Sequence, residues 1–402
     1  MSVEGWELKR LDEIGDICSG STPSTTKPGY WDGDIVWVTP NDLSKLNTPY
    51  LTTSNKKITQ QGLKSCSAQV IPAGSIILSS RAPIGYVAIA TIDCCTNQGC
   101  KSFNLKQSYD SEFVYYNLKF NVDKIKNLGE GTTFAEISKT ALAKVQIAFL
   151  ENREEQTQIA AILSTIDRAI EQTEAIIAKQ QRIKTGLMQD LLTKGIDEDG
   201  NVRSEETHEF KDSPLGRIPV EWEVKTLNKV ASLQRGHDIR EIDFIPGNCP
   251  VIASSGIIGF HKFSTSSAPN VVVGRKGSIG NVHYIDSDFW AHDTSLFVTN
   301  FFGNQEKYIY YLFSNLKLER FGTKSGSPSL NRNDIHPLLV GIPNPTEQRK
   351  IIRVLSECDR SLTGFSEELE KSKRRKTGLM HDLLTGNVRV TALLNDSKNA
   401  KI

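Results

Sequence analysis

The most restrictive feature of this sequence is a helical stretch of 38 residues that occurs twice. Residues 156–193 and 348–385 align without a gap at an offset of 192, with 17 identities in the 38 positions. The match is densest where Lys184–Met188 recurs as Lys376–Met380. Unrelated segments of this length share far fewer residues, so the chain contains an internal duplication. Any fold for this chain must therefore contain two like helices.

Apolar positions in both copies follow helical spacing and include a heptad row. The row Leu163, Ile170, Ile177, Lys184, Leu191 has the counterpart Leu355, Leu362, Leu369, Lys376, Leu383. A seven-residue apolar repeat of this length is typical of a coiled-coil seam, so we predict two long helices that pack on each other. Lys184 and Lys376 interrupt the row at the same point, which lowers stability and fixes the register. The predicted interface residues are Leu163, Ile166, Ile170, Ile177, Leu187, Leu191, Leu355, Leu362, Phe365, Leu369, Leu379 and Leu383.

Length and composition set the class of the protein. A chain of 402 residues is too long for one ordinary core and suggests two or three domains. Apolar content of 38% and charged content of 24% are typical of a soluble globular protein, and no apolar run approaches the roughly 20 residues that span a bilayer. Residues 1–10 lack the apolar core of a signal peptide, and seven cysteines argue against a secreted disulfide scaffold. We expect a cytoplasmic protein.

The net charge of +1 conceals an uneven distribution along the chain. Residues 151–213 carry 8 basic and 14 acidic side chains, whereas residues 345–402 carry 12 basic and 8 acidic ones. This balance neither requires nor excludes nucleic acid as a partner. A DNA-binding protein with so little excess charge needs local basic patches or a basic partner.

A globular module of mixed α/β type precedes each long helix. The modules open alike, because Trp6–Lys9 reappears as Trp222–Lys225, and Arg81–Val87 reappears as Lys276–Val282. Between these anchors the modules hardly resemble each other, which indicates a shared mechanical role and two different recognition functions. Short apolar runs bounded by Gly, Pro and Asp predict strands at 35–38, 70–71, 75–78, 86–90, 271–273, 282–285 and 296–298, and helices are predicted at 111–120 and 306–316. Residues 194–219 are predicted to be a linker, and the short tail after Thr385 is expected to be partly frayed.

The sequence contains no recognisable catalytic motif. Gly322–Ser325 lacks the glycine five residues earlier that a phosphate-binding loop requires, and no His-Glu-x-x-His occurs. Cys94, Cys95 and Cys100 lack a second ligand pair at zinc spacing, which favours buried neutral thiols over a metal site. Asp286, Asp288 and Asp293 could suggest a metal-dependent nuclease, but no partnering Glu-x-Lys element lies nearby, so a solvated loop is favoured. We therefore predict no catalytic and no metal-binding residues.

Basic and aromatic residues in the loops of both modules are candidates for contact with nucleic acid. Arg and Lys neutralise phosphates or bond to guanine edges, and each of these side chains could equally be a solvated surface charge. The predicted DNA-binding residues are Lys27, Tyr30, Lys56, Lys57 and Arg81 in module one, and Arg235, His237, Arg240, Lys262, Arg275, Lys276 and Lys324 in module two.

The order module–helix–module–helix resembles the specificity subunit of type I restriction–modification systems. The resemblance covers essentially the whole chain, and the order and spacing of its motifs are more specific than any one of them. The supporting motifs are 20–24 (Gly-Ser-Thr-Pro-Ser), 30–31, 37–39, 42–43, 81–85, 155–156, 184–188, 191–193, 210–216, 218–219 and 222, with the second helical copy. Module two departs from the pattern at 234–238 (Gln-Arg-Gly-His-Asp), where nothing matches Tyr30 and Trp31.

The resemblance implies an α/β fold with two target-recognition domains and two long antiparallel helices in a pseudo-twofold repeat. Each domain would recognise one half of a bipartite, asymmetric double-stranded DNA target, and the helices would set the spacing between the halves. The implied partners are two methyltransferase subunits, which hold S-adenosylmethionine, and restriction–translocation subunits, which use ATP with Mg. This chain itself would hold no cofactor and would have no membrane partner.

The corresponding domain boundaries follow the duplication. Module one is predicted at 1–150, the central conserved helix at 151–195, a linker at 196–220, module two at 221–345, the C-terminal conserved helix at 346–390 and a tail at 391–402.

Three hypotheses for function were compared. The leading one is a DNA-specificity subunit without catalysis of its own, which two similar but divergent modules favour. The alternative is a stand-alone DNA nuclease or a methyltransferase fragment, which would cleave or modify DNA as an isolated chain. A third is a purely structural coiled-coil adaptor, which would show no sequence preference in a footprint.

Overall fold

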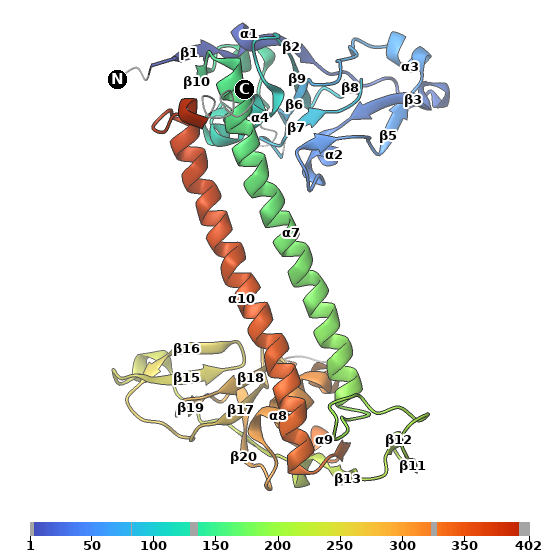
Figure 1. Cartoon of the computed structure of the whole chain (residues 1–402), viewed down its shortest axis with the longest axis vertical. Coiled ribbons are helices and arrows are strands. Elements are labelled where there is room, and N and C mark those ends of the chain that lie inside the picture. Colours follow the sequence, from blue (N-terminus) through green and yellow to red (C-terminus); the bar gives the residue numbers. More distant parts are fainter. Residues whose placement is uncertain (1–3, 82, 129–135, 323–327, 394–402) are drawn as a thin grey trace, which may run out of the picture. The chain divides into compact units, whose positions relative to one another are not determined.

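The computed structural model describes residues 4–81, 83–128, 136–322 and 328–393. The chain forms two compact units, which are described separately: unit 1 holds residues 1–173 and 368–402, and unit 2 holds residues 174–367. Helices α7 (Arg153–Leu191) and α10 (Pro345–Leu384) each contribute one end to each unit (Figure 1). Within the described residues, no helix combines the length and the apolar character that crossing a membrane requires.

Unit 1 is built on a five-stranded sheet and a smaller three-stranded sheet. The large sheet has the order β2 (Gly15–Ser19), β9 (Cys100–Leu105), β6 (Ile76–Ser79), β7 (Val87–Ala90) and β4 (Tyr50–Leu51). The small sheet has the order β5 (Lys56–Ile58), β3 (Trp31–Val38) and β8 (Cys95–Thr96). Short helices and a further strand pair complete the unit: β1 (Trp6–Arg10), α1 (Leu11–Ile14), η1 (Pro28–Tyr30), α2 (Pro40–Ser44), α3 (Gln60–Lys64), α5 (Val122–Lys126), α6 (Lys139–Ala143) and β10 (Gln146–Leu150).

Helix α4 (Ser111–Phe120) connects the large sheet of unit 1 to the long helices. Asp110 caps its N-terminus by accepting a hydrogen bond from the Phe113 amide, and the buried helix residues pack with Phe103 of β9. The same core includes Leu163 of α7 and Leu383 of α10. The module and the adjoining ends of both helices therefore share one hydrophobic core.

Unit 2 repeats this architecture with different strands. The main sheet has the order β14 (Ser232–Arg235), β20 (Ser295–Asn300), β17 (Asn270–Gly274) and β18 (Val282–Ile285). The second sheet has the order β16 (Gly256–His261), β15 (Cys249–Ala253) and β19 (Trp290–Ala291). The remaining elements are β11 (Phe210–Ser213), β12 (Gly216–Pro219), β13 (Glu223–Thr226), η2 (Leu227–Lys229), η3 (Glu241–Asp243), α8 (Glu306–Asn315), η4 (Leu318–Phe321), α9 (Arg332–Ile335) and β21 (Leu339–Ile342).

Two glycines at matching positions show which turns of the two modules are equivalent. Gly20 follows β2 and Gly236 follows β14, and each passes close to the turn between two other strands. A Cβ on Gly20 would lie 2.0 Å from the main-chain oxygen of Asn97, and one on Gly236 would lie 2.1 Å from that of His292. Only glycine allows this approach. The turns after β8 and after β19 are therefore equivalent positions in the two modules.

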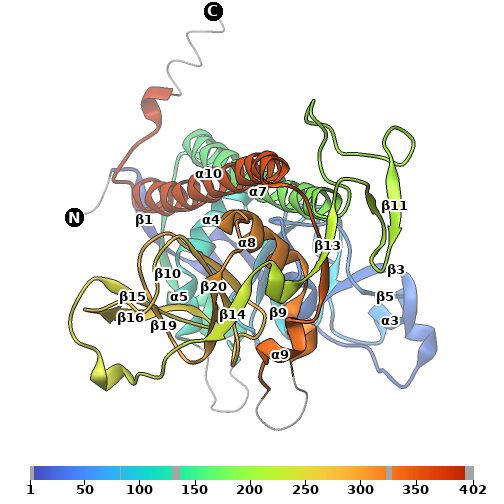
Figure 2. The same ribbon diagram turned by 90° about the horizontal axis from the view of Figure 1, so that it is seen from below.

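The long helices pack in antiparallel fashion within each unit. In unit 1 the start of α7 lies beside the end of α10, and in unit 2 the end of α7 lies beside the start of α10 (Figure 1, Figure 2). The buried seam residues are Leu163 and Leu383 in unit 1 and Leu191 and Leu355 in unit 2. Leu379 and Leu187 are half-buried and pack against the same two cores. The remaining predicted interface residues are only half-buried and belong to neither core: Ile166, Ile170, Ile177, Leu362, Phe365 and Leu369.

The two lysines that interrupt the heptad row form ion pairs across the helix pair. In unit 2, Lys184 of α7 pairs with Asp359 of α10, and Tyr311 of α8 donates a hydrogen bond of 2.6 Å to the same carboxylate. In unit 1, Lys376 pairs with Asp167, which also accepts a hydrogen bond of 2.9 Å from Tyr116 of α4. Each unit thus joins its module helix to both long helices through one carboxylate.

In each unit, an arginine also forms an ion pair with a glutamate at the start of one long helix. In unit 2 the guanidinium of Arg203 binds both carboxylate oxygens of Glu347, and both side chains are buried. In unit 1, Arg389 binds both oxygens of Glu155 at 2.7 Å. These hydrogen bonds lower the pKa of Glu155. Each helix start is therefore bound by an arginine that follows the other helix in the chain.

Several expected segments differ in the structure. The stretch 194–219 carries the β11–β12 hairpin, and Ile196 and Ile218 are buried. The tail after Thr385 is ordered as far as Val390, whose side chain belongs to the unit 1 core. Residues 70–71 form one isolated bridge between Ile71 and Cys94 instead of a strand.

Candidate nucleic-acid interface

Four of the predicted contacts in module one lie together around Trp31. The ammonium group of Lys27 lies 5.3 Å from the ring centre of Tyr30 and donates a hydrogen bond of 3.3 Å to its hydroxyl group. Lys56 lies 5.4 Å from the ring centre of Trp31, and Lys57 is its neighbour on β5. Trp31 is fixed by an edge contact with Trp37 and by a hydrogen bond from its Nε1 to the main-chain oxygen of Ser24. This surface combines cations for phosphate with aromatic rings, which is common in nucleic-acid interfaces.

Arg81 is separate from that group because it pairs with an acidic residue. Its Nε donates a hydrogen bond of 2.8 Å to Glu136, and Lys101 lies 3.7 Å from the other oxygen of that carboxylate. Burial is the main cause that lowers the pKa of Lys101. Part of the positive charge of Arg81 is therefore balanced within the module.

Three of the predicted contacts in module two line one cavity, and a fourth, Lys276, follows one of them in the chain. Arg235, His237 and Arg275 line a cavity of about 800 Å³. Lys276 follows Arg275, and its amide donates a hydrogen bond to the main-chain oxygen of Thr294, as does the amide of Arg275. Residues that the sequence did not suggest also line this cavity, namely Gln234, Asp238, Asn331 and Arg332. Three arginines and two amide side chains thus converge where the sequence predicted isolated surface charges.

Asp293 is a residue of module two whose surroundings the sequence does not predict. Its carboxylate is 15% exposed and accepts a hydrogen bond of 2.9 Å from Nη2 of Arg235. It was assigned to a solvated loop, yet it lies in the turn after β19 and holds a predicted DNA contact. No local sequence signal links Asp293 to Arg235, because the two residues are 58 positions apart.

The other predicted residues of module two are dispersed. Arg240 forms a two-point ion pair with Asp243 in η3, and this pair raises the pKa of Arg240. Lys262 follows β16 and lies 5.5 Å from the ring centre of Phe263. Lys324 lies outside the described residues.

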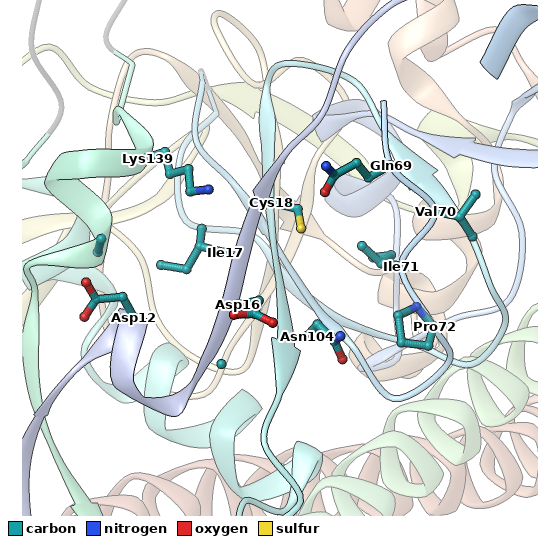
Figure 3. A pocket seen from close by; sticks show the side chains of 12 residues that line it. Asp12, Asp16, Ile17, Cys18, Gln69, Val70, Ile71, Pro72, Asn104 and Lys139 are labelled. Atoms are coloured by element: carbon teal, nitrogen blue, oxygen red, sulfur yellow. The ribbon is translucent and has the colours of Figure 1, made fainter. Parts of the chain in front are cut away.

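A second cavity, in unit 1, shares no residue with the predicted DNA contacts. It measures about 600 Å³ and lies beside the edge strand β2 (Figure 3). Two carboxylates, Asp12 and Asp16, and the ammonium group of Lys139 line it. Because its charges are mixed and net acidic, we do not include it in the candidate interface.

Cys94, Cys95 and Cys100 of module one are buried. Burial raises the pKa of Cys94 and of Cys95 to about 12, and it also raises the pKa of Cys100. Within the ranges that the structure describes, no group of three or more His, Cys, Asp or Glu residues could hold a metal ion.

The long helices carry an exposed stripe that is identical in the two copies. Each stripe follows one helix face at spacings of three and four residues. Its members are Lys179, Arg182, Gly186 and Asp190 on α7 with Thr193 just after its end, and Lys371, Arg374, Gly378 and Asp382 on α10 with Thr385 just after its end. Asp190 and Thr385 are half-exposed, and the other members are exposed. A Cβ on Gly186 or on Gly378 would meet no atom within 4 Å. Packing within the chain therefore does not explain these two helix glycines, each of which costs about 1 kcal/mol relative to alanine.

Comparison with known proteins gives a consistent family. A family model described as the type I restriction modification DNA specificity domain matches residues 3–180 and 219–371. The MjaIX type I restriction enzyme specificity subunit of Methanocaldococcus jannaschii is 28% identical, with 96% of this chain and 94% of the relative covered. The EcoprrI specificity subunit of Escherichia coli is 24% identical, with 90% of each chain covered.

Solved structures show the same fold. The S subunit of a type I restriction–modification system from M. genitalium superposes with a TM-score of 0.63 at 19% identity, covering 95% of this chain and 96% of the other. A chain from a study of complex assembly and conformational transition of the type I R-M system gives a TM-score of 0.60 at 15% identity, covering 96% of this chain and all of the other. At these identities the likeness establishes the α/β fold with its long helices.

Proposed function

This chain belongs to the type I restriction modification DNA specificity family, and we propose that each of its globular modules recognises one half of a bipartite, asymmetric DNA target. The chain is a recognition subunit and not itself an enzyme. The observation that carries the proposal is the contrast between a repeated frame and two unlike surfaces. Module one presents lysines beside Tyr30 and Trp31, whereas module two presents an arginine-lined cavity. Two different surfaces on one repeated frame suit two different half-sites.

Exchanging one module tests whether each module recognises its own half of the target. Replacing residues 1–150 with the corresponding module of another specificity subunit should change one half of the methylated sequence and leave the other half unchanged. The measurement is a genome-wide map of methylated positions in cells that carry the hybrid gene. A hybrid that methylates the original sequence in both halves would contradict the proposal.

The partners and cofactors belong to the same proposal. The helix pair would set the half-site spacing and bind two methyltransferase subunits, which would hold S-adenosylmethionine. Restriction–translocation subunits would use ATP and Mg. The alternative of a stand-alone nuclease or methyltransferase fragment gains no support from the relatives, which are named as specificity subunits.

We place the methyltransferase contact on the duplicated stripe of the helices. An identical exposed face in each copy suits two copies of one partner, and a helix glycine with open space beside it lets a partner approach the backbone closely. Gly186 and Gly378 would then be retained for the partner and not for the stability of this chain.

Substituting both glycines separates stability from assembly. Gly186→Gln with Gly378→Gln should raise the thermal stability of the free chain, because glutamine is a better helix former and meets no atom. The same change should weaken methyltransferase binding by about ten- to a hundredfold, since overpacking a contact costs about 1–3 kcal/mol. Differential scanning calorimetry and titration calorimetry measure the two effects.

Gly364 provides a matched control. It lies on α10 with no atom within 4 Å of its Cβ position, but its counterpart in the other copy is Gln172. Gly364→Gln should stabilise the helix and leave methyltransferase binding unchanged. If the double variant at 186 and 378 also bound normally, the stripe would not be the docking face.

A further inference from the structure

The strongest unexplained arrangement outside the helices is the pair of arginines held by Asp293. Arg235 donates from Nη2 to the Asp293 carboxylate at 2.9 Å, and Arg275 donates from Nη1 to the Asp293 main-chain oxygen at 3.2 Å. The Asp293 side chain is 15% exposed, whereas that of Arg235 is 53% exposed. The largely buried carboxylate of Asp293 therefore holds the half-exposed guanidinium of Arg235 in place.

The turn that carries this carboxylate is held by its neighbours. Nδ1 of His292 accepts a hydrogen bond of 3.2 Å from the Thr294 amide. The other ring nitrogen of His292 lies 3.2 Å from the main-chain oxygen of Ile239. Gly236 brings the strand that carries Arg235 against this turn. The Asp293 carboxylate thus orients the guanidinium of Arg235 before any ligand binds.

This fixed guanidinium keeps donors available for a ligand. An arginine has five N–H donors in a planar fork, and the Asp293 carboxylate uses Nη2. Arg235 lines the cavity together with Gln234, Asn331 and Arg332, so its accessible edge faces a space that other polar groups share. A planar donor fork matches the O6 and N7 acceptors of guanine in the major groove, which is the commonest specific contact of arginine with DNA.

We propose that Arg235 recognises a guanine in the half-site bound by module two, with Asp293 and Arg275 as positioning residues. The inference rests on the proposed function, because it assigns a base to one of the two recognition surfaces. Lys276, which follows Arg275 in the chain, would neutralise a phosphate, whereas the planar fork of Arg235 would distinguish bases.

The equivalent positions of module one carry different chemistry. Arg235 is the last residue of β14, and the last residue of β2 is Ser19. The amide of Ser80 bonds to Gly99 as that of Arg275 bonds to Thr294, and Gln98 occupies the place of Asp293 in the turn after β8. Module one therefore has no counterpart of the arginine pair, and the guanine contact belongs to one half-site only.

A charge-conserving substitution tests the assignment. The complex of the full chain with its methyltransferase subunits first gives the wild-type target sequence. Arg235→Lys should then reduce discrimination at one G·C pair of the module-two half by about ten- to a hundredfold. All other positions of the target should keep their preference. Methylation rates on duplexes with single base-pair changes measure this profile.

The result that would overturn the proposal is equally specific. If Arg235 only contacted phosphate, lysine would replace it, and the base preference at every position would stay unchanged. A uniform loss of affinity across all sequences would likewise contradict base recognition. Either outcome could occur while module exchange still moved the half-site, so failure of this inference is distinguishable from failure of the proposed function.

Two further variants complete the experiment. Asp293→Asn removes the charge that fixes the fork and should relax discrimination at the same G·C pair, whereas a merely structural role would affect all positions alike. Arg217→Lys is the matched control, because Arg217 is also half-exposed and ion-paired, with Glu205. This control should leave the methylation profile unchanged.

Discussion

Replacing Arg203 with methionine is expected to lower the free energy of unfolding of unit 2 by about 3–5 kcal/mol. The substitution leaves the carboxylate of Glu347 buried without its cation. The remaining donors to this carboxylate are Nε1 of Trp222 at 3.3 Å and the amide of Ile196 at 2.9 Å. These neutral donors do not compensate a buried charge, because breaking one side of a buried ion pair costs far more than the pair itself contributes.

Hydrogen exchange of unit 2 amides measures the effect without assuming that the whole chain unfolds in one step. Adding Glu347→Gln to Arg203→Met should recover most of the loss, since the charge that needed compensation is gone. Arg217→Met is a matched control in the same unit, because Arg217 and its partner Glu205 are exposed and such pairs contribute about 1 kcal/mol or less. A loss for Arg203→Met no larger than that of the control would contradict the buried-pair account.

Leu355→Asp should destabilise unit 2 by about 4 kcal/mol or more. Leu355 is fully buried in the core that joins α10 to α8 and to the end of α7. The substitution removes that packing and places a carboxylate where it cannot be solvated. The expected observation is a loss of unit 2 protection in hydrogen exchange.

Leu362→Asp supplies the comparison for Leu355→Asp. The two leucines occupy the same heptad row, yet Leu362 is half-buried and belongs to neither core that the seam residues join. We expect a loss of about 1 kcal/mol for Leu362→Asp. Equal losses of stability for both variants would contradict the difference in burial between Leu355 and Leu362.

This comparison marks how far the sequence predicted the helix pair. The gapless repeat predicted both helices, and the heptad row identified Leu163, Leu191, Leu355 and Leu383, which are buried. It gave equal weight to residues in the middle of the row, such as Ile170, because periodicity specifies a helix face and not the distance to its neighbour. The module cores are packed against the seam only at the helix ends.

The sequence contained a signal for some of the ionic contacts but not for others. Asp167 and Asp359 are identical in the two helical copies, so the repeat contained the signal for the partners of Lys376 and Lys184. Arg203 and Arg389 were not predicted, because the segments that follow the helices differ in length and fall outside the gapless alignment. Long-range pairs of this kind arise from the tertiary fold.

The sequence suggested which basic residues could belong to the candidate interface, but it did not predict how they are arranged in space. The sequence selected Arg235, His237 and Arg275 singly, and the strand order of unit 2 brings them to one cavity. The sequence assigns Asp293 to a solvated loop because no Glu-x-Lys element of a metal-dependent nuclease lies near it. Loops from distant segments meet only through the sheet that carries them, and no local pattern records that meeting.

Residues 383–390 contribute side chains to the unit 1 core, so this core depends on a segment that is synthesised long after module one. Unit 2 is complete in the chain at residue 367, whereas the core of unit 1 also needs Leu383, Leu384 and Val390, which are synthesised after all of unit 2. Module one is therefore translated before module two but completed after it. A stop codon between residues 367 and 383 would leave every residue of unit 2 in place and leave module one with an open core.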